Sequence, residues 1–166
     1  ALYGIGKKLT QKTEFSKLSK GLAISLMIAI GIGFHNLGEG LAVGAAIALG
    51  EVALSTFFIV GFATHNTTEG LAIAAPLTST KAKIVKMIGL GLIAGVPAIF
   101  GTWIGGFSFS PFFILIFLAI GAGAIFQVVL SIFHYMNEKS DLLSNTSLFA
   151  GISAGLIVMY LTSVII

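Results

Sequence analysis

Cysteine and arginine are both missing from the 166 residues, and only 9% of the side chains are charged. Without cysteine, the chain forms neither a disulfide nor a thiolate metal site. A soluble domain carries about 25% charged residues, so this scarcity of charge, together with 57% hydrophobic residues, predicts an integral membrane protein. The nine basic side chains are all lysines and lie beside apolar segments. We therefore expect no nucleic-acid partner.

Long apolar segments make up most of the chain after a lysine-rich stretch at residues 1–20. That stretch is expected to lie at the cytoplasmic membrane surface. Each apolar segment reaches or exceeds the roughly 20 residues that a spanning helix needs. The segments cover residues 21–49, 52–77, 84–106, 111–136 and 146–166. The sequence thus predicts an all-α fold, a polytopic transmembrane helical bundle with residues 21–166 in a single transmembrane domain.

The lysines all fall on one side of this five-span arrangement. They lie in the first flank, around the start of the third span and in the connection before the fifth. The positive-inside rule places that side in the cytoplasm, which leaves the C-terminus outside, and we expect the plasma membrane. The chain opens A-L-Y-G without an initiator methionine, so it is expected to be part of a longer protein.

The sequence H-N-x-x-E-G-L-A occurs twice, thirty residues apart, within the first two apolar segments. The side chains that carry chemistry are His35, Asn36, Glu39, His65, Asn66 and Glu69. The two glutamates are the only acidic or basic residues between positions 21 and 50 and between positions 52 and 80. A charged residue at the centre of a membrane helix costs roughly 2.5–3.5 kcal/mol. Two such carboxylates predict a compensating cation.

The spacing predicts that each histidine shares a helix face with the glutamate four residues later. Each asparagine lies about 100° round the helix and flanks that face. If the two segments are antiparallel helices, a turn centred at position 52 sets each histidine opposite the other helix's glutamate. A turn centred at position 50 instead sets the two histidines opposite each other. Both registers bring the six side chains to one depth, and imidazole with carboxylate suits zinc, iron or manganese.

Paired H-N-x-x-E-G motifs on consecutive membrane helices resemble the fourth and fifth helices of the ZIP family of metal-ion transporters, in particular its GufA-like branch. The second copy's trailing E-G-L-A-I-A-A-P-L also resembles that family's fifth helix. The resemblance covers the five apolar segments. It implies an eight-helix fold, in which the first three helices would be N-terminal partners from the same protein. A homodimer is left open.

The resemblance implies a transporter, not an enzyme, that moves a divalent metal ion into the cytoplasm. Zinc is the first expectation, with iron, manganese and cadmium open; the ion is cargo and not a resident cofactor. The expected metal ligands or their neighbours are His35, Asn36, Glu39, His65, Asn66 and Glu69. The alternative is an intramembrane hydrolase with a metal-activated water, but the duplicated ligand set suits a symmetric ion site better. A purely structural membrane protein would leave the two glutamates unexplained.

This sequence departs from the family pattern at several positions. Gly38 and Thr68 replace the prolines of the frequent H-N-x-P-E-G motif. Family members often have a glutamate before the proline of the sixth helix, where this chain has Val96 before Pro97. Because a second ion would need that extra carboxylate, we expect one tightly held ion.

Small residues predict how the helices pack. Gly-x-x-x-Gly spacings, which allow close helix–helix approach, begin at Gly40, Gly91, Gly101 and Gly151. The threonines of the second motif region either bond their own helix backbone or contact a passing ion, and the sequence leaves both readings open. These threonines are Thr64, Thr67 and Thr68.

Overall fold

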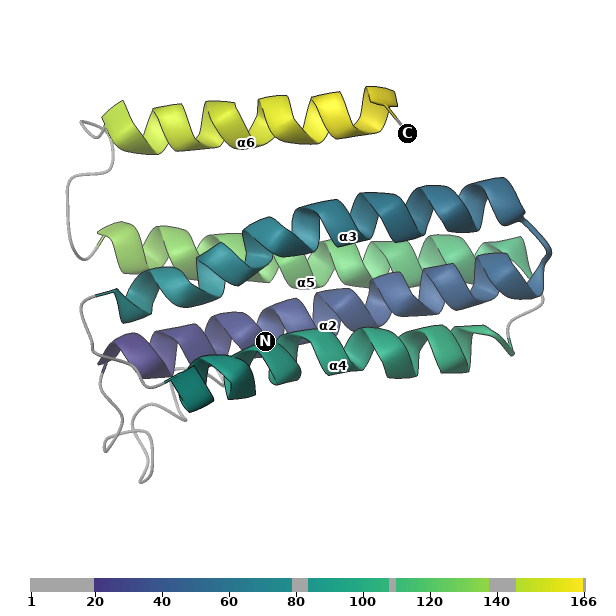
Figure 1. The fold of residues 1–166 in the computed structure, drawn as a ribbon, viewed down its shortest axis with the longest axis horizontal. Helices are drawn as coiled ribbons and strands as arrows, with labels where there is room; N and C mark the ends of the chain where they lie inside the picture. The colour runs from purple at the N-terminus through teal and green to yellow at the C-terminus, as the bar shows by residue number, and fades with distance from the viewer. Residues whose placement is uncertain (1–19, 79–83, 108–109, 138–145, 166) are drawn as a thin grey trace.

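The computed structural model describes residues 20–78, 84–107, 110–137 and 146–165, and these ranges contain helices and turns but no strand (Figure 1). The all-α prediction is therefore confirmed for the described residues. The elements are α2 (Lys20–Ala48), α3 (Val52–Ala74), the 3₁₀ turn η2 (Ala75–Leu77), α4 (Ile84–Gly105), α5 (Pro111–Asn137) and α6 (Thr146–Ile165). The predicted basic segment, residues 1–20, lies outside the described residues except for Lys20, which is the first residue of α2.

Three of the described helices, α2, α4 and α5, are long and apolar enough to cross a membrane. The chain is therefore a helical membrane protein. Helix α3 is long enough, at 23 residues, but the polar motif in its second half lowers its hydropathy. In α6 the described apolar stretch runs over Thr146–Val158. The α6 residues whose side-chain exposure is described are all exposed except Leu148, as expected of a helix that faces lipid or further helices.

The predicted second segment, residues 52–77, ends earlier as an α-helix than expected. Helix α3 stops at Ala74, and the next three residues form η2. Pro76 explains the change, because it has no N–H to donate to a carbonyl of the preceding turn and its ring would clash with the carbonyl four residues earlier in a continuing α-helix. The other four predicted segments match α2, α4, α5 and α6 to within one residue at each end.

Helix α2 is the central element, with α3, α4 and α5 packed round it (Figure 1). Successive helices from α2 to α5 run in alternating directions, so the C-terminal ends of α2 and α4 lie beside the N-terminal ends of α3 and α5. Central position explains why more than half of the residues of α2 are buried, whereas only three are buried in α3.

The closest helix contact joins α2 and α4 through two of the predicted glycine spacings. A Cβ added at Gly40 would overlap the Ala98 carbonyl, and one added at Gly105 would overlap the Leu41 carbonyl. Backbone therefore packs on backbone along this interface, as the spacings beginning at Gly40 and Gly101 predicted.

The other two glycine spacings, which begin at Gly91 and Gly151, meet no neighbour among the described residues, so close packing at them stays a prediction. A Cβ at Gly91, Gly95, Gly151 or Gly155 would have no neighbour within 4 Å. The reason is orientation: the face of α4 that meets α2 carries the glycines at 101 and 105, and Gly151 and Gly155 lie on an exposed part of α6.

Two apolar layers pack against α2 on either side of its polar motif. One layer consists of Ile28, Ala29, Ile32, Ile73, Leu77, Leu90, Ala94 and Val128. The other consists of Ala42, Val43, Ala45, Ala46, Phe58 and Ile114. The polar motif at residues 35–39 falls between them, close to the middle of α2. A carboxylate at this depth is far from either end of the helix and must be satisfied within the protein.

The turn from α2 to α3 sets the register of these two helices. Gly50 has φ +74°, a left-handed conformation that glycine adopts without strain. Its N–H donates to the Ile47 carbonyl at 3.0 Å, and the Glu51 N–H donates to the Ala46 carbonyl at 3.0 Å. This pair of bonds is a Schellman C-cap, and α3 begins at Val52 directly after it.

Candidate metal centre

The two motif copies meet with the histidine–glutamate pairing expected for a turn centred at position 52, although the turn itself lies between Ala48 and Val52. His65 Nε2 lies 2.8 Å from Glu39 Oε1, and His35 Nε2 lies 3.3 Å from Glu69 Oε1. Each histidine therefore faces the other helix's glutamate, which decides between the two registers that the sequence left open. The two imidazole rings still lie near each other, with centroids 5.9 Å apart.

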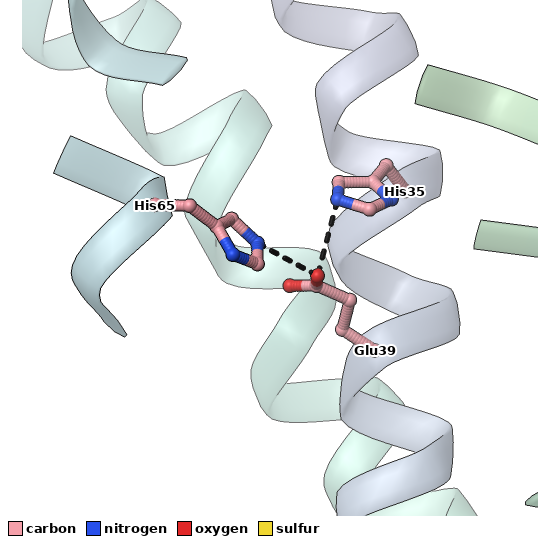
Figure 2. A group of neighbouring side chains, drawn as sticks. All are labelled: His35, Glu39 and His65. Carbon is pink, nitrogen blue, oxygen red and sulfur yellow. Dashed lines mark hydrogen bonds and ion pairs between the residues drawn. The ribbon is translucent and has the colours of Figure 1, made fainter. Parts of the chain in front are cut away.

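Glu39 is the shared member of the cluster. Its Oε1 lies 2.8 Å from His65 Nε2 and 3.1 Å from His35 Nε2, so this one oxygen contacts both histidines (Figure 2). One ligand atom from each of these three residues lies within 4.8 Å of the others. Two ligands of a tetrahedral zinc ion, with Zn–N and Zn–O near 2.0–2.1 Å, are about 3.3 Å apart. The histidine–glutamate separations of 2.8, 3.1 and 3.3 Å lie at or just below that spacing.

The protonation of His35 follows from its second ring nitrogen. His35 Nδ1 lies 2.8 Å from the Gly121 carbonyl oxygen of α5. A carbonyl oxygen only accepts, so Nδ1 carries the proton and donates it. Nε2 then faces the oxygen atoms of Glu39 and Glu69, which are also acceptors. Only a cation between them, either a proton or a metal ion, satisfies all three atoms.

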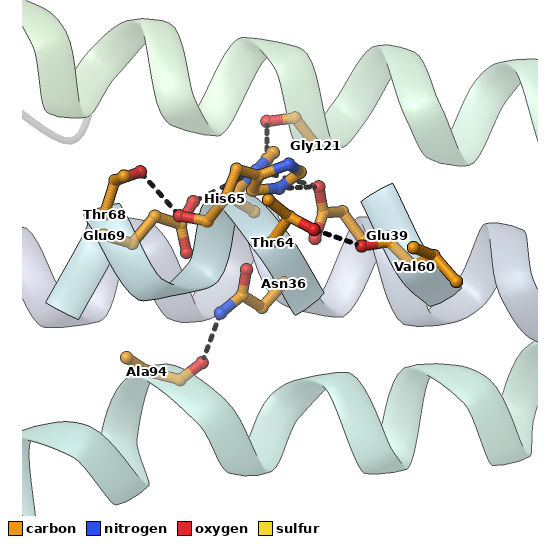
Figure 3. A network of polar contacts seen from close by, with 10 residues as sticks. Asn36, Glu39, Val60, Thr64, His65, Thr68, Glu69, Ala94 and Gly121 are labelled. Atoms are coloured by element: carbon orange, nitrogen blue, oxygen red, sulfur yellow. Dashed lines mark hydrogen bonds and ion pairs between the residues drawn. The ribbon is translucent and has the colours of Figure 1, made fainter. Parts of the chain in front are cut away.

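Asn36 lies beside this cluster and is anchored to α4, but one of its atoms has no partner. Its Nδ2 donates to the Ala94 carbonyl of α4 at 3.0 Å. Its Oδ1 is buried and has no hydrogen-bond partner in the described structure. Figure 3 shows the amide nitrogen turned toward Ala94 and the oxygen on the side of Glu69 and His65. A buried unpaired acceptor costs about 1–3 kcal/mol, and a bound cation would remove that cost.

Asn66 instead supports a glutamate on its own helix. In the amide orientation that satisfies its neighbours, its nitrogen donates to Glu69 Oε2 at 3.1 Å and to the Phe62 carbonyl at 3.3 Å. Asn66 therefore fixes the carboxylate that faces His35. The six predicted residues are thus brought to one level of the bundle: the histidines and glutamates are linked through three contacts, and the two asparagines lie beside them.

The motif-region threonines all bond their own helix. Thr64 Oγ1 donates to the Val60 carbonyl at 2.8 Å, Thr67 Oγ1 to the Ala63 carbonyl at 3.4 Å, and Thr68 Oγ1 to the His65 carbonyl at 2.6 Å. Figure 3 shows Thr64 and Thr68 in these positions. All three threonines are exposed. Backbone bonding, one of the two readings of the sequence, is confirmed.

Two partners of the cluster were missed in the sequence because they are main-chain atoms. These are the carbonyls of Ala94 on α4 and Gly121 on α5. Every residue carries a carbonyl, so no residue type marks them. The one available signal was a glycine at position 121, which permits a close approach of α5.

Comparisons with known proteins leave the site to be interpreted from its own chemistry. The chain matches no protein-family model, no curated protein and no solved structure.

Proposed function

We propose that this chain is the metal-binding part of a divalent-metal transporter of the ZIP type, with an eight-helix fold of which five helices are present here. Zinc is the first expected ion, followed by iron, with manganese and cadmium open. The observation that carries the proposal is the position of His35 Nε2, which faces the carboxylate oxygens of Glu39 and Glu69 midway along α2.

The chemistry of the cluster favours a metal over a proton as the cation that it binds. Two imidazoles and two carboxylates supply borderline nitrogen and hard oxygen ligands, the set that divalent transition metals take in proteins. Two carboxylates also balance the charge of a dication, so the ion and its ligands together would carry no net charge at this depth. The buried and unpaired Asn36 Oδ1 adds an uncharged oxygen beside them.

The degree of enclosure supports transport over permanent retention. The side chains of the four central residues keep between 6% and 17% of their surface exposed. An ion there is stripped of most of its water but is not sealed in. The amides of Asn36 and Asn66 add polarity without charge, which limits how tightly the ion is trapped.

For orientation, we propose the plasma membrane, with the lysine-bearing end of the bundle in the cytoplasm and the C-terminus outside. The support is the one-sided lysine distribution. Lys86, which is exposed in the first turn of α4, should react with a membrane-impermeant amine reagent only in inverted vesicles. Mass spectrometry locates the label, and labelling of Lys86 on intact cells would reverse the topology.

The function is tested by zinc uptake into proteoliposomes that contain the full-length protein. We expect saturable uptake for the wild type, and none for His35→Ala or Glu69→Ala inserted at equal density. Normal uptake by both variants would remove the site assignment. Turnover of a peptide or ester substrate by protein that shows no metal flux would favour the hydrolase instead.

A further inference from the structure

Helices α2 and α5 pack closely at the level of the metal centre, where Gly38 and Gly121 face each other. A Cβ added at Gly38 would lie 2.8 Å from the Phe117 carbonyl oxygen and 2.9 Å from Gly121 Cα. A Cβ added at Gly121 would lie 3.3 Å from the His35 carbonyl oxygen and 3.4 Å from His35 Nδ1. No side chain fits between the helices at Gly38, and one at Gly121 would press on His35.

This close approach is what allows a helix carbonyl to serve a side chain of another helix. Carbonyl oxygens within an α-helix accept one backbone hydrogen bond and retain a second lone pair. The second lone pair of Gly121 reaches His35 Nδ1 at 2.8 Å. Moving α5 outward by the thickness of a methyl group would break this contact, because hydrogen bonds weaken beyond about 3.2 Å.

We propose that Gly121 is a positioning residue for the metal centre, and that Gly38 allows it to act. Its main-chain carbonyl holds the Nδ1 proton of His35 and so presents Nε2 to the ion. This inference rests on the metal-binding function proposed above and concerns how one ligand of that site is aimed. Among the described residues no comparable main-chain bond holds His65, which makes His35 the oriented histidine of the pair.

Partners that hold the far nitrogen of a metal-binding histidine fix the ring's tautomer and orientation, and their loss typically lowers metal affinity about 10–100-fold. A purely structural role for the two glycines predicts something different. Packing loss would lower stability without a selective effect on one histidine. The two roles are separated by variants at the same helix interface.

The experiment measures zinc affinity by calorimetry on the full-length protein, and the His35 Nδ1 proton by NMR with ¹⁵N-labelled histidine. Gly38→Ala is the main variant, since its methyl group would overlap the backbone of α5 and separate the two helices. Gly121→Ala is the milder one, since its methyl group requires a shift of only a few tenths of an ångström. The matched control is Gly31→Ala, which meets only the Val128 side chain in the same α2–α5 interface. Gly123→Ala on α5 meets nothing within 4 Å.

We expect Gly38→Ala to bind zinc about 10–100-fold more weakly than wild type and to lose the slowly exchanging Nδ1 proton of His35, with a smaller loss in Gly121→Ala. Both controls should keep the proton and the affinity. Unchanged zinc affinity and an unchanged Nδ1 proton in Gly38→Ala would overturn the inference. Equal losses in Gly31→Ala would also overturn it, because packing alone would then explain them. A wild type without zinc affinity would instead refute the proposed function itself.

Discussion

The two copies of the H-N-x-x-E-G motif share a sequence but not an environment. In the α2 copy, His35 and Asn36 are tied to main-chain carbonyls of α5 and α4. In the α3 copy, His65 is held by Glu39 across the helix pair, and Asn66 bonds only within α3. The α2 copy is held by the neighbouring helices α4 and α5, whereas the α3 copy is held mainly by Glu39 of the α2 copy.

The intervening residues show the same contrast. Between the asparagine and the glutamate, the α2 copy has Leu37 and the buried Gly38, but the α3 copy has the exposed Thr67 and Thr68. A helix packed on several sides holds its side chains more rigidly than a helix packed on one. The difference teaches that a duplicated motif need not make a symmetric site, because neighbours that the motif does not encode decide which copy is rigid.

The largest expected effect comes from Glu39, the residue on which both copies converge. Glu39→Gln removes the one carboxylate that contacts both histidines, and we expect zinc affinity to fall by more than about 100-fold, beyond the loss of an outer partner. Glu69→Gln, which alters the contacts to His35 and Asn66 but leaves Glu39 between the two histidines, should cost less. Calorimetry on both variants measures the order. A larger loss of zinc affinity in Glu69→Gln than in Glu39→Gln would contradict the assignment of Glu39 as the shared ligand.

The asparagines should differ in the same direction. Asn36→Ala removes the unpaired Oδ1 that faces the cluster, so zinc affinity should fall about 10–100-fold. Metal-free stability should change by less than about 1.5 kcal/mol, because a lost hydrogen bond is offset by the loss of an unsatisfied oxygen. Asn66→Ala should lower the affinity less.

Thermal unfolding and zinc titration of both asparagine variants provide the check. Equal losses of affinity in the two variants would show that the two copies are equivalent. That result would remove the asymmetry described above.

The smallest expected effect is at Thr67, which is exposed and bonds only the Ala63 carbonyl. Thr67→Ala should leave zinc uptake unchanged and stability within about 0.5 kcal/mol of wild type. Uptake assays in proteoliposomes at matched density test this expectation. A clear fall in uptake would place Thr67 on the path of the ion.

The sequence was sufficient for the helices and for the polar residues that meet. Apolar length defined α2 to α6 closely, and the repeat itself identified the six side chains. The register was not decidable, since it depends on one residue in the turn, where Gly50 and the Schellman bonds place the start of α3. The packing of α2 against α3 had to be known before one of the two registers could be chosen.

Packing partners were only half predictable for the same reason. A Gly-x-x-x-Gly spacing states that a helix can be approached closely, and not which face of the helix is approached. Gly40 and Gly105 lie in an interface, but Gly91 and Gly151 lie in open positions. The carbonyl partners on α4 and α5 were invisible to sequence reasoning, because main-chain atoms are the same at every residue.

The central claim, that both motif copies hold one ion, is tested most directly by anomalous scattering from crystals of the full-length protein grown with zinc. We expect one strong peak about 2.0–2.2 Å from Nε2 of His35, Nε2 of His65 and an oxygen of Glu39. A single ion is expected because Val96 leaves no further carboxylate beside Pro97. Two peaks of comparable strength would contradict the single-ion account, and a peak remote from these residues, or none, would contradict the metal centre itself.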